Sequence, residues 1–249
     1  QEETGELLLW GHGERHLTTA KERLQDYGVE VEFSVPKVPY RETIKKVAEG
    51  QGKYKKQTGG HGQYGDVWLR LEPASEYGFE WRITGGVIPS KYQEAIEEGI
   101  KEAAKKGVLA GFPVMGFKAI VYNGSYQEGD SSGVVFRIAA SLACTKVLSE
   151  AHLVFLEAMY RLKVLVPQER VGDVLSDLQA RRGRILGMEQ EGALSVVHAE
   201  VPLAEVLEYY KALPGLTGGA GAYTLEFSHY AEVPPHLAQR IVQERAQEG

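Results

Sequence analysis

The segment Gly52–Glu72 reads GKYKKQTGGHGQYGDVWLRLE, and it decides between two classes of fold. Three of its glycines, Gly60, Gly62 and Gly65, match G-x-G-x-x-G, the pattern of a dinucleotide-binding turn. That turn needs a strand before it and a helix after it, so that the helix N-terminus meets the pyrophosphate. Here a polar, basic stretch precedes the glycines, and the alternating stretch Asp66–Glu72 that follows is typical of a strand. The sequence therefore predicts a hairpin with a long, flexible, Gly-rich tip and argues against a Rossmann fold.

Further elements extend outward from this hairpin. Hydrophobic periodicity, proline starts and glycine stops predict strands and helices on both sides of it. The predicted strands are Tyr40–Val47, Val67–Glu72, Phe79–Thr84 and Pro113–Tyr122, and the predicted helices are Pro89–Lys106 and Gly133–Ala151. A second polar loop, Asn123–Ser132, precedes the second helix. In that loop Asp130, Ser131 and Ser132 are in the position of helix caps.

The two ends of the chain have different patterns. At the start, a predicted strand, helix and strand occupy Gly5–Trp10, Gly13–Tyr27 and Val29–Val35, a unit too short to be a domain alone. After Met159 the order is β-α-β-β-α-β, the split βαβ or ferredoxin-like arrangement, with a four-stranded antiparallel sheet and two helices on one face. Its strands are Tyr160–Val166, Arg184–Glu189, Ala193–Val201 and Ala222–Tyr230, and its helices are Gln168–Arg181 and Leu203–Leu213. Two prolines then precede a terminal helix.

Composition limits the classes of function. The chain has 249 residues, of which 28 are basic and 34 acidic, and its net charge is −6. A bulk electrostatic attraction to nucleic acid or anionic lipid is therefore not indicated, and any such contact must come from a local basic patch. The single cysteine, Cys144, lies in an apolar run and is interpreted as a small buried residue, which suits a reducing cytoplasm. No stretch is long and apolar enough to span a membrane, and the chain reads as a piece of a longer polypeptide.

Two basic clusters are candidate contacts for RNA. The hairpin tip combines lysines with amides and aromatic rings, a mixture that RNA-binding loops use, although a solvated hairpin would look the same. Arg181, Arg182 and Arg184 surround Gly183 at a predicted helix end. They are interpreted either as complements of the helix dipole or as phosphate ligands. No metal-binding spacing, cofactor motif or nucleophile–base pair is evident, and Gly50–Lys56 is not a P-loop because Tyr54 replaces the Ser or Thr that binds magnesium.

Several longer stretches together resemble the elongation factor G family of bacterial translational GTPases. Domain IV of that family is similar to VPYRETI (Val38–Ile44), KQTGGHGQYGDV (Lys56–Val67), GGVIPSKY (Gly85–Tyr92), LAGFPV (Leu109–Val114) and GSYQEGDSS (Gly124–Ser132). Domain V is similar to GDVLSDLQARRGRILGME (Gly172–Glu189) and HAEVPLAEV (His198–Val206). Domain III is similar to GHGERHL (Gly11–Leu17). The resemblance covers nearly the whole chain, in order.

This resemblance implies an α+β architecture in four parts. Residues 1–37 would be the latter part of domain III with a partial βαβ, and 38–156 would be domain IV with a left-handed βαβ crossover and tip loops at 50–65 and 123–132. Residues 157–232 would be the ferredoxin-like domain V, and 233–249 a C-terminal helix. The GTPase domain, which would bind GTP and Mg, is absent, so no cofactor or catalytic residue is expected in this chain. The longer parent is expected to be a GTPase.

The resemblance also implies partners and site residues. The domain IV tip would enter the decoding site of the small ribosomal subunit, contact tRNA and mRNA, and promote translocation. The expected tip residues are Lys53, Lys55, Lys56, Gln57, Thr58, Gly59, Gly60, His61, Ser125, Tyr126, Gln127, Glu128 and Asp130. Arg181, Arg182 and Arg184 would meet rRNA near the GTPase-associated centre and sarcin–ricin loop of the large subunit. A cytoplasmic monomer without membrane contact is expected.

Departures from the family pattern leave other interpretations open. Gln127 and His61 stand where the family usually has histidine and arginine, and loss of tip cations weakens an electrostatic hold on RNA. A specialised paralogue for ribosome recycling, rescue or protection is therefore the first alternative. A generic ferredoxin-like RNA-binding module is another, but its predicted central strands lack the exposed aromatic residues of such modules. An enzyme with its own pocket has the least support.

Overall fold

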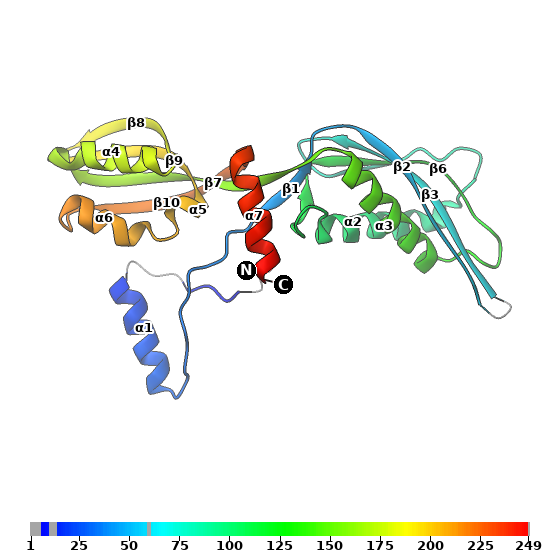
Figure 1. Ribbon diagram of the computed structural model, residues 1–249, viewed down its shortest axis with the longest axis horizontal. Coiled ribbons are helices and arrows are strands. Elements are labelled where there is room, and N and C mark those ends of the chain that lie inside the picture. The colour runs from blue at the N-terminus through cyan, green and yellow to red at the C-terminus, as the bar shows by residue number, and fades with distance from the viewer. Residues whose placement is uncertain (1–5, 10–13, 59–60, 249) are drawn as a thin grey trace. The chain divides into compact units, whose positions relative to one another are not determined.

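The computed structural model describes residues 6–9, 14–58 and 61–248, and its contacts divide the chain into two units (Figure 1). Unit 1 comprises Gln1–Pro39 and Glu157–Ala231, and unit 2 comprises Tyr40–Leu156 and Glu232–Gly249. Strand β7 (Leu153–Pro167) runs through the boundary between them in the sequence. Each unit combines helices with β-sheet, which confirms the predicted α+β class.

The main sheet of unit 2 has four strands in the order β2-β3-β6-β4. Strands β2 (Ala48–Thr58) and β3 (His61–Pro73) form an antiparallel hairpin that pairs continuously from Ala48–Leu71 to Thr58–His61. On the other side β3 pairs with β6 (Phe117–Ser125). Strand β4 (Gly78–Trp81) runs parallel to β6, and the connection between them contains α2 (Gln93–Lys106). This confirms a βαβ crossover, while its hand stays a prediction from the resemblance.

Two helices cover one face of this sheet (Figure 1). Helix α3 (Gly133–Glu150) packs on β2 and β3, and α2, preceded by the short helix η1 (Ser90–Tyr92), packs on α3. Burial alternates along β3 as expected for a sheet with one covered face: Val67, Leu69 and Leu71 are buried, whereas the residues between them are partly exposed. The core beneath the sheet is formed by these side chains and by apolar residues of α2 and α3.

The expected flexible tip is wrong for most of its length, because residues 50–58 and 61–65 are paired strand. The glycines serve packing rather than flexibility. A Cβ on Gly52 would lie 2.2 Å from the Ala139 carbonyl oxygen and 2.4 Å from the Ala143 nitrogen, and one on Gly65 would lie 3.0 Å from Val135. Only glycine lets the hairpin approach the α3 backbone this closely.

The remaining strands of unit 2 belong to the second sheet. Strand β1 (Arg41–Ile44) lies between β5 (Val114–Met115), to which it is parallel, and residues 153–156 of β7, to which it is antiparallel. The C-terminal helix α7 (Pro235–Glu248) packs here, since Ile241 and Val233 share a small core with Phe155.

Unit 1 has the predicted ferredoxin-like order. Its strands β7, β8 (Arg184–Glu191), β9 (Leu194–Pro202) and β10 (Ala222–Glu232) are arranged as β10-β7-β9-β8. The short η2 (Gln168–Arg170), α4 (Val171–Ala180), α5 (Leu203–Val206) and α6 (Tyr209–Thr217) lie at the predicted helical positions. Apolar residues of α4, α5 and α6 share one core with the strands, so the helices cover the same face.

The beginning of unit 1 differs from its prediction. Helix α1 (Glu14–Asp26) is present, but residues 6–9 and 29–35 are not strands, so a partial βαβ does not form in the described part. Val29, Phe33 and Val35 remain exposed. A strand needs a neighbouring strand to satisfy its backbone, and residues 29–35 pair with none in the described residues.

Candidate nucleic-acid interface

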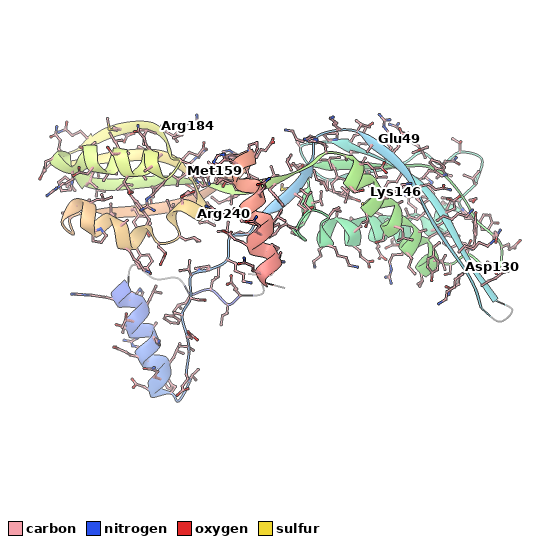
Figure 2. The ribbon with its side chains drawn as sticks, in the orientation of Figure 1. Glu49, Asp130, Lys146, Met159, Arg184 and Arg240 are labelled. Carbon is pink, nitrogen blue, oxygen red and sulfur yellow. The ribbon has the colours of Figure 1, made fainter. Side chains whose placement is uncertain are left out.

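Asp130 joins the two predicted tip loops of unit 2. Its Oδ1 atom accepts a hydrogen bond from the Gly62 backbone N–H at 3.2 Å, and its carbonyl oxygen accepts one from the Tyr64 N–H at 2.9 Å. A Cβ on Gly62 would lie 2.4 Å from Asp130 Oδ2, so a side chain at position 62 would push the Asp130 carboxylate away from this contact. Figure 2 shows Asp130 beside the end of the β2–β3 hairpin. The loop after β6 is therefore bound to the hairpin end.

The loop is closed by a second set of bonds centred on Ser131. Its hydroxyl donates to the Tyr64 carbonyl oxygen at 2.6 Å and accepts from the Gln127 N–H at 3.0 Å. The Gln127 carbonyl oxygen accepts from the Asp130 and Ser131 N–H groups at 3.2 and 3.0 Å. The predicted capping role falls to Ser132, whose hydroxyl accepts from the Val135 N–H at the start of α3. Because its backbone is bonded on both sides, Gln127 is held at a defined place.

A buried polar chain supports the hairpin behind the tip. The Tyr64 hydroxyl lies 2.8 Å from Ser125 Oγ, and Ser125 donates to Asp66 Oδ2 at 2.9 Å. Gln51 donates to Asp66 Oδ1 at 2.7 Å, so both oxygens of this buried carboxylate have partners. Of these residues, Ser125 was an expected tip contact and Tyr64 was one of the aromatic rings of the basic tip. The others could not be found from spacing, because each partner lies on a different strand.

The side chains that point to solvent at this end are polar, charged or aromatic, and one of them, Glu128, is acidic. Those described as exposed are Lys53, Lys55, Lys56, Gln57, Gln63, Tyr126, Gln127 and Glu128. None of the three lysines has an ion pair among the described residues, and Lys53 Nζ lies 5.4 Å from the centre of the Tyr64 ring. Thr58 and His61 form the last pair of the ladder, and their side chains are not described. Gly59 and Gly60 lie outside the described residues.

The folds of both units and this tip match known proteins. The family model of elongation factor G, domain IV, matches residues 36–152, and the model of the elongation factor G C-terminus matches residues 154–241. The chain belongs to the elongation factor G family. "Elongation factor G" of Aquifex pyrophilus is 46% identical over 247 residues, which cover 98% of this chain and 35% of the relative.

Two further proteins are similar to this chain. "Elongation factor G-like protein" of Thermotoga maritima is 47% identical over 99% of this chain and 37% of its own length. A crystal structure of a Thermus thermophilus protein is 93% identical, with a TM-score of 0.94, over 100% of this chain and 38% of that one. The chain thus spans about a third of the length of the curated relatives it matches. A protein named elongation factor G and one named elongation factor G-like protein are 46% and 47% identical to this chain. Sequence identity therefore does not decide which of the two kinds this chain comes from.

The predicted rRNA-binding arginines are largely engaged within unit 1. Arg182 makes a two-pronged pair with the buried Glu157, at 2.8 and 2.9 Å, and its Nε donates to Glu205 at 3.0 Å. The hydrogen bond with Glu157 raises the pKa of Arg182 further above its ordinary value. Arg181 donates to Asp177 and to the Glu205 carbonyl oxygen. These two cations therefore tie the end of α4 to its surroundings.

Arg184 differs from its two neighbours. It donates to Glu200 at 2.7 Å, which lowers the pKa of Glu200, but 72% of its side chain remains exposed. Figure 2 labels it on β8. Of the three arginines it offers the most surface to a phosphate.

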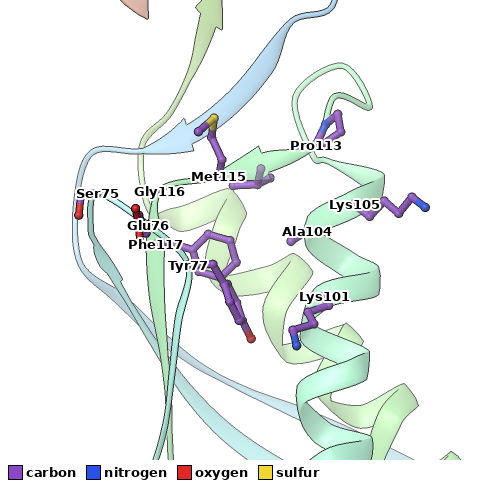
Figure 3. Close-up of a pocket in the computed structure, with 11 residues that line it drawn as sticks. Ser75, Glu76, Tyr77, Lys101, Ala104, Lys105, Pro113, Met115, Gly116 and Phe117 are labelled. Atoms are coloured by element: carbon purple, nitrogen blue, oxygen red, sulfur yellow. The ribbon is translucent and has the colours of Figure 1, made fainter. Parts of the chain in front are cut away.

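A shallow pocket of about 480 Å³ lies elsewhere in unit 2, between α2 and the segment 113–117 (Figure 3). Its lining is mostly apolar and includes Tyr77, Met115 and Phe117. Lys101 at its edge is already paired with Glu97 at 2.8 Å. A ligand site needs free polar groups that converge on one point, so we assign no ligand to this pocket.

No group of His, Cys, Asp and Glu side chains within the described ranges has the arrangement of a metal site. None of the helices in the part of the chain that the structure describes is long and apolar enough to cross a membrane.

Proposed function

We propose that this chain is the ribosome-binding portion of an elongation factor G-like translation factor that promotes GTP-dependent translocation. In this proposal the tip of unit 2 enters the decoding site of the small subunit and contacts tRNA and mRNA. GTP and Mg would be bound by the GTPase domain of the longer parent, a cytoplasmic monomer. Membership of the elongation factor G family supports the partner, and the tip supports the mode of contact.

The observation that carries the proposal is the pair of hydrogen bonds that Asp130 accepts from the Gly62 and Tyr64 N–H groups, which we call the Asp130 clasp. It holds the loop with Tyr126 and Gln127 against the hairpin that bears Lys55, Lys56 and Gln57. Amides reach the ribose hydroxyls of an RNA minor groove, and lysines neutralise phosphates. Bonded backbones keep both sets in place before RNA arrives, which lowers the entropy cost of binding.

Chemical footprinting on ribosomes carrying the intact parent factor tests this function. Gln57→Ala and Gln127→Ala remove one exposed amide from each loop, and Lys211→Ala in unit 1 serves as a matched surface control. We expect protection of decoding-site bases by the parent factor and by the control, with weaker protection by both tip variants. Binding to the ribosome without decoding-site protection would sink the proposal.

A specialised paralogue for ribosome recycling, rescue or protection is the second candidate. Gln127 favours it, because a neutral amide stands at the exposed loop where the family pattern has a histidine. A subunit-splitting assay with the recycling factor separates the two candidates. Splitting without translocation by the parent would support the paralogue, and translocation at normal rate would support the first proposal.

For the large subunit, we propose Arg184 as the most available rRNA contact of the three predicted arginines. Arg181 and Arg182 would then support it by fixing the end of α4. Arg184→Ala should weaken ribosome binding without loss of folding, whereas Arg182→Ala should first lower the stability of unit 1, because it leaves Glu157 buried without its partner.

A further inference from the structure

The face of the main unit 2 sheet that turns away from α3 carries aromatic rings on its two central strands. We call it the open face and define it by residues of β2, β3 and β6 on the side of the sheet opposite α3. Its members are Gln51, Lys53, Lys55, Tyr64, Asp66, Trp68, Arg70 and Tyr122, of which Tyr64 and Asp66 are buried. In Figure 1 both α2 and α3 lie on the opposite side of the sheet.

Trp68 and Tyr122 form the centre of the open face. Their ring centroids are 6.4 Å apart with an interplanar angle of 55°. The β3–β6 register shifts between Trp68 and Leu69, where Trp68 pairs with Asn123 and Leu69 with Val121. Tyr122 is the extra residue of this bulge, and the bulge brings its ring beside Trp68. Both side chains are partly exposed and neither belongs to the core beneath the sheet.

Paired and unpaired charges lie at opposite ends of the open face. Toward the base of the sheet, Arg70 pairs with Glu49 and Glu72, and the Tyr122 hydroxyl donates to Glu49. Both oxygens of Asp66 are occupied by Gln51 and Ser125. Toward the tip, Lys53 and Lys55 have no carboxylate partner among the described residues. The free positive charge therefore lies at the tip end, next to the rings.

We propose that the open face binds unpaired bases of RNA, which stack on Trp68 and Tyr122 while the backbone phosphates run along Lys53 and Lys55. Sheets that read single-stranded RNA use exposed rings on central strands in this way. Lys53 and Lys55 are two residues apart on one strand and so point to the same face, about 7 Å apart. Only the identity of the RNA as ribosomal rests on the proposed function. The stacking surface itself extends the tip interface along the sheet.

Fluorescence anisotropy with a labelled 12-nucleotide oligouridylate and a blunt RNA duplex of equal length tests the proposal. The full chain should bind the single strand more tightly than the duplex. Trp68→Leu and Tyr122→Leu, which remove a ring, should each weaken single-strand binding about tenfold, in line with the cost of losing one stacked base. Tyr122→Phe keeps the ring and loses only the hydroxyl bond to Glu49, so it should bind like the original chain.

Two further measurements keep the test independent of folding and of the tip. Circular dichroism and thermal melting identify any variant that does not fold, and Trp68→Met then replaces Trp68→Leu, because it also removes the ring but keeps an unbranched apolar side chain. Lys211→Ala lies in unit 1, outside both the open face and the tip, and should leave oligouridylate affinity unchanged. The proposed stacking surface is wrong if the ring-removing variants fold and bind oligouridylate like the original chain, or if only lysine substitutions weaken binding. This holds whatever the ribosome footprint shows. Preferential binding of a protein partner by this face would overturn it equally.

Discussion

Asp130 and Ser132 illustrate what a single residue reveals from sequence. The run Asp130–Ser132 before α3 predicted capping, and Ser132 does cap the helix. Asp130 instead binds the Gly62 N–H, a partner 68 positions away in the sequence. Capping is local and follows from residue type, whereas the contact of Asp130 depends on how the loop after β6 meets the hairpin. The same limit hid the partners of Asp66 and Tyr64, which lie across the sheet.

Glu42 provides a stability prediction at the same scale. Its fully buried carboxylate accepts four backbone N–H groups, from Val108 and Leu109 on Oε2 at 2.8 and 3.0 Å and from Ala110 and Phe112 on Oε1 at 3.0 and 3.2 Å. Glu42→Gln turns one acceptor oxygen into a donor facing two donors. We expect a loss of about 3 kcal/mol in the free energy of unfolding.

Urea unfolding followed by tryptophan fluorescence measures that loss, because Trp68 and Trp81 both lie in unit 2. The control is Glu102→Gln, whose exposed carboxylate is 3.7 Å from Arg137. It should change stability by less than about 0.5 kcal/mol. Equal effects of the two variants would contradict a stabilising role of the four hydrogen bonds that Glu42 accepts.

Cys144 gives a chemical prediction. It is completely buried, its thiol is directed to the Ile100 carbonyl oxygen at 3.7 Å, and burial raises its pKa to about 12. The raised pKa keeps the thiol protonated at pH 8, where an unfolded cysteine of pKa about 8.5 is partly thiolate. Reaction with an aromatic disulfide reagent at pH 8 should therefore be at least ~100-fold slower in the folded chain than in denaturant. Comparable rates would show that the site opens readily.

At the scale of elements, periodicity predicted most helices and strands, and glycine was misread at the tip. The ferredoxin-like order of unit 1 followed from short periodic segments with clear stops. The hairpin looked like a loop because glycines and lysines have low strand propensity. Packing against α3 requires glycine in β2 and β3, and tertiary contact outweighs propensity there. The strands expected near α1 lacked partners in the described residues, which no local pattern could reveal.

Gly52→Ala tests the contact between the hairpin and α3. The added Cβ would meet the α3 backbone at 2.2 and 2.4 Å, and backbone cannot yield as a flexible side chain does. We expect a loss of about 2–3 kcal/mol, measured by thermal unfolding, and altered geometry of the tip. The control is Gly133→Ala at the start of α3, where the added Cβ meets only Ala95 at an ordinary 3.6 Å and stability should be unchanged. A tolerated Gly52→Ala would contradict the close approach.

At the scale of the whole molecule, the local charge at the unit 2 hairpin differs in sign from the net charge of the chain. The net charge of −6 opposes bulk attraction to RNA, yet three lysines without ion pairs in the described residues gather at the unit 2 hairpin. Elsewhere, many cations are paired with carboxylates, as Lys211 is with Glu208. Such a distribution suppresses indiscriminate binding and directs a polyanion to one place. The composition argues against a bulk effect, and the basic run before the glycines predicted where the unpaired lysines lie.

The salt dependence of binding measures how many of these lysines neutralise phosphates. If Lys53, Lys55 and Lys56 each neutralise one phosphate of single-stranded RNA, the slope of log K against log salt should be about −2, so affinity falls about 20-fold between 50 and 200 mM KCl. Lys55→Gln or Lys56→Gln should reduce the magnitude of the slope by about 0.7 each. Lys211→Gln removes the same charge from unit 1 and should leave the slope unchanged, because its ammonium is already paired. A slope that responds equally to Lys211→Gln would mean that RNA senses the net charge of the chain, and the tip would then have no electrostatic role of its own.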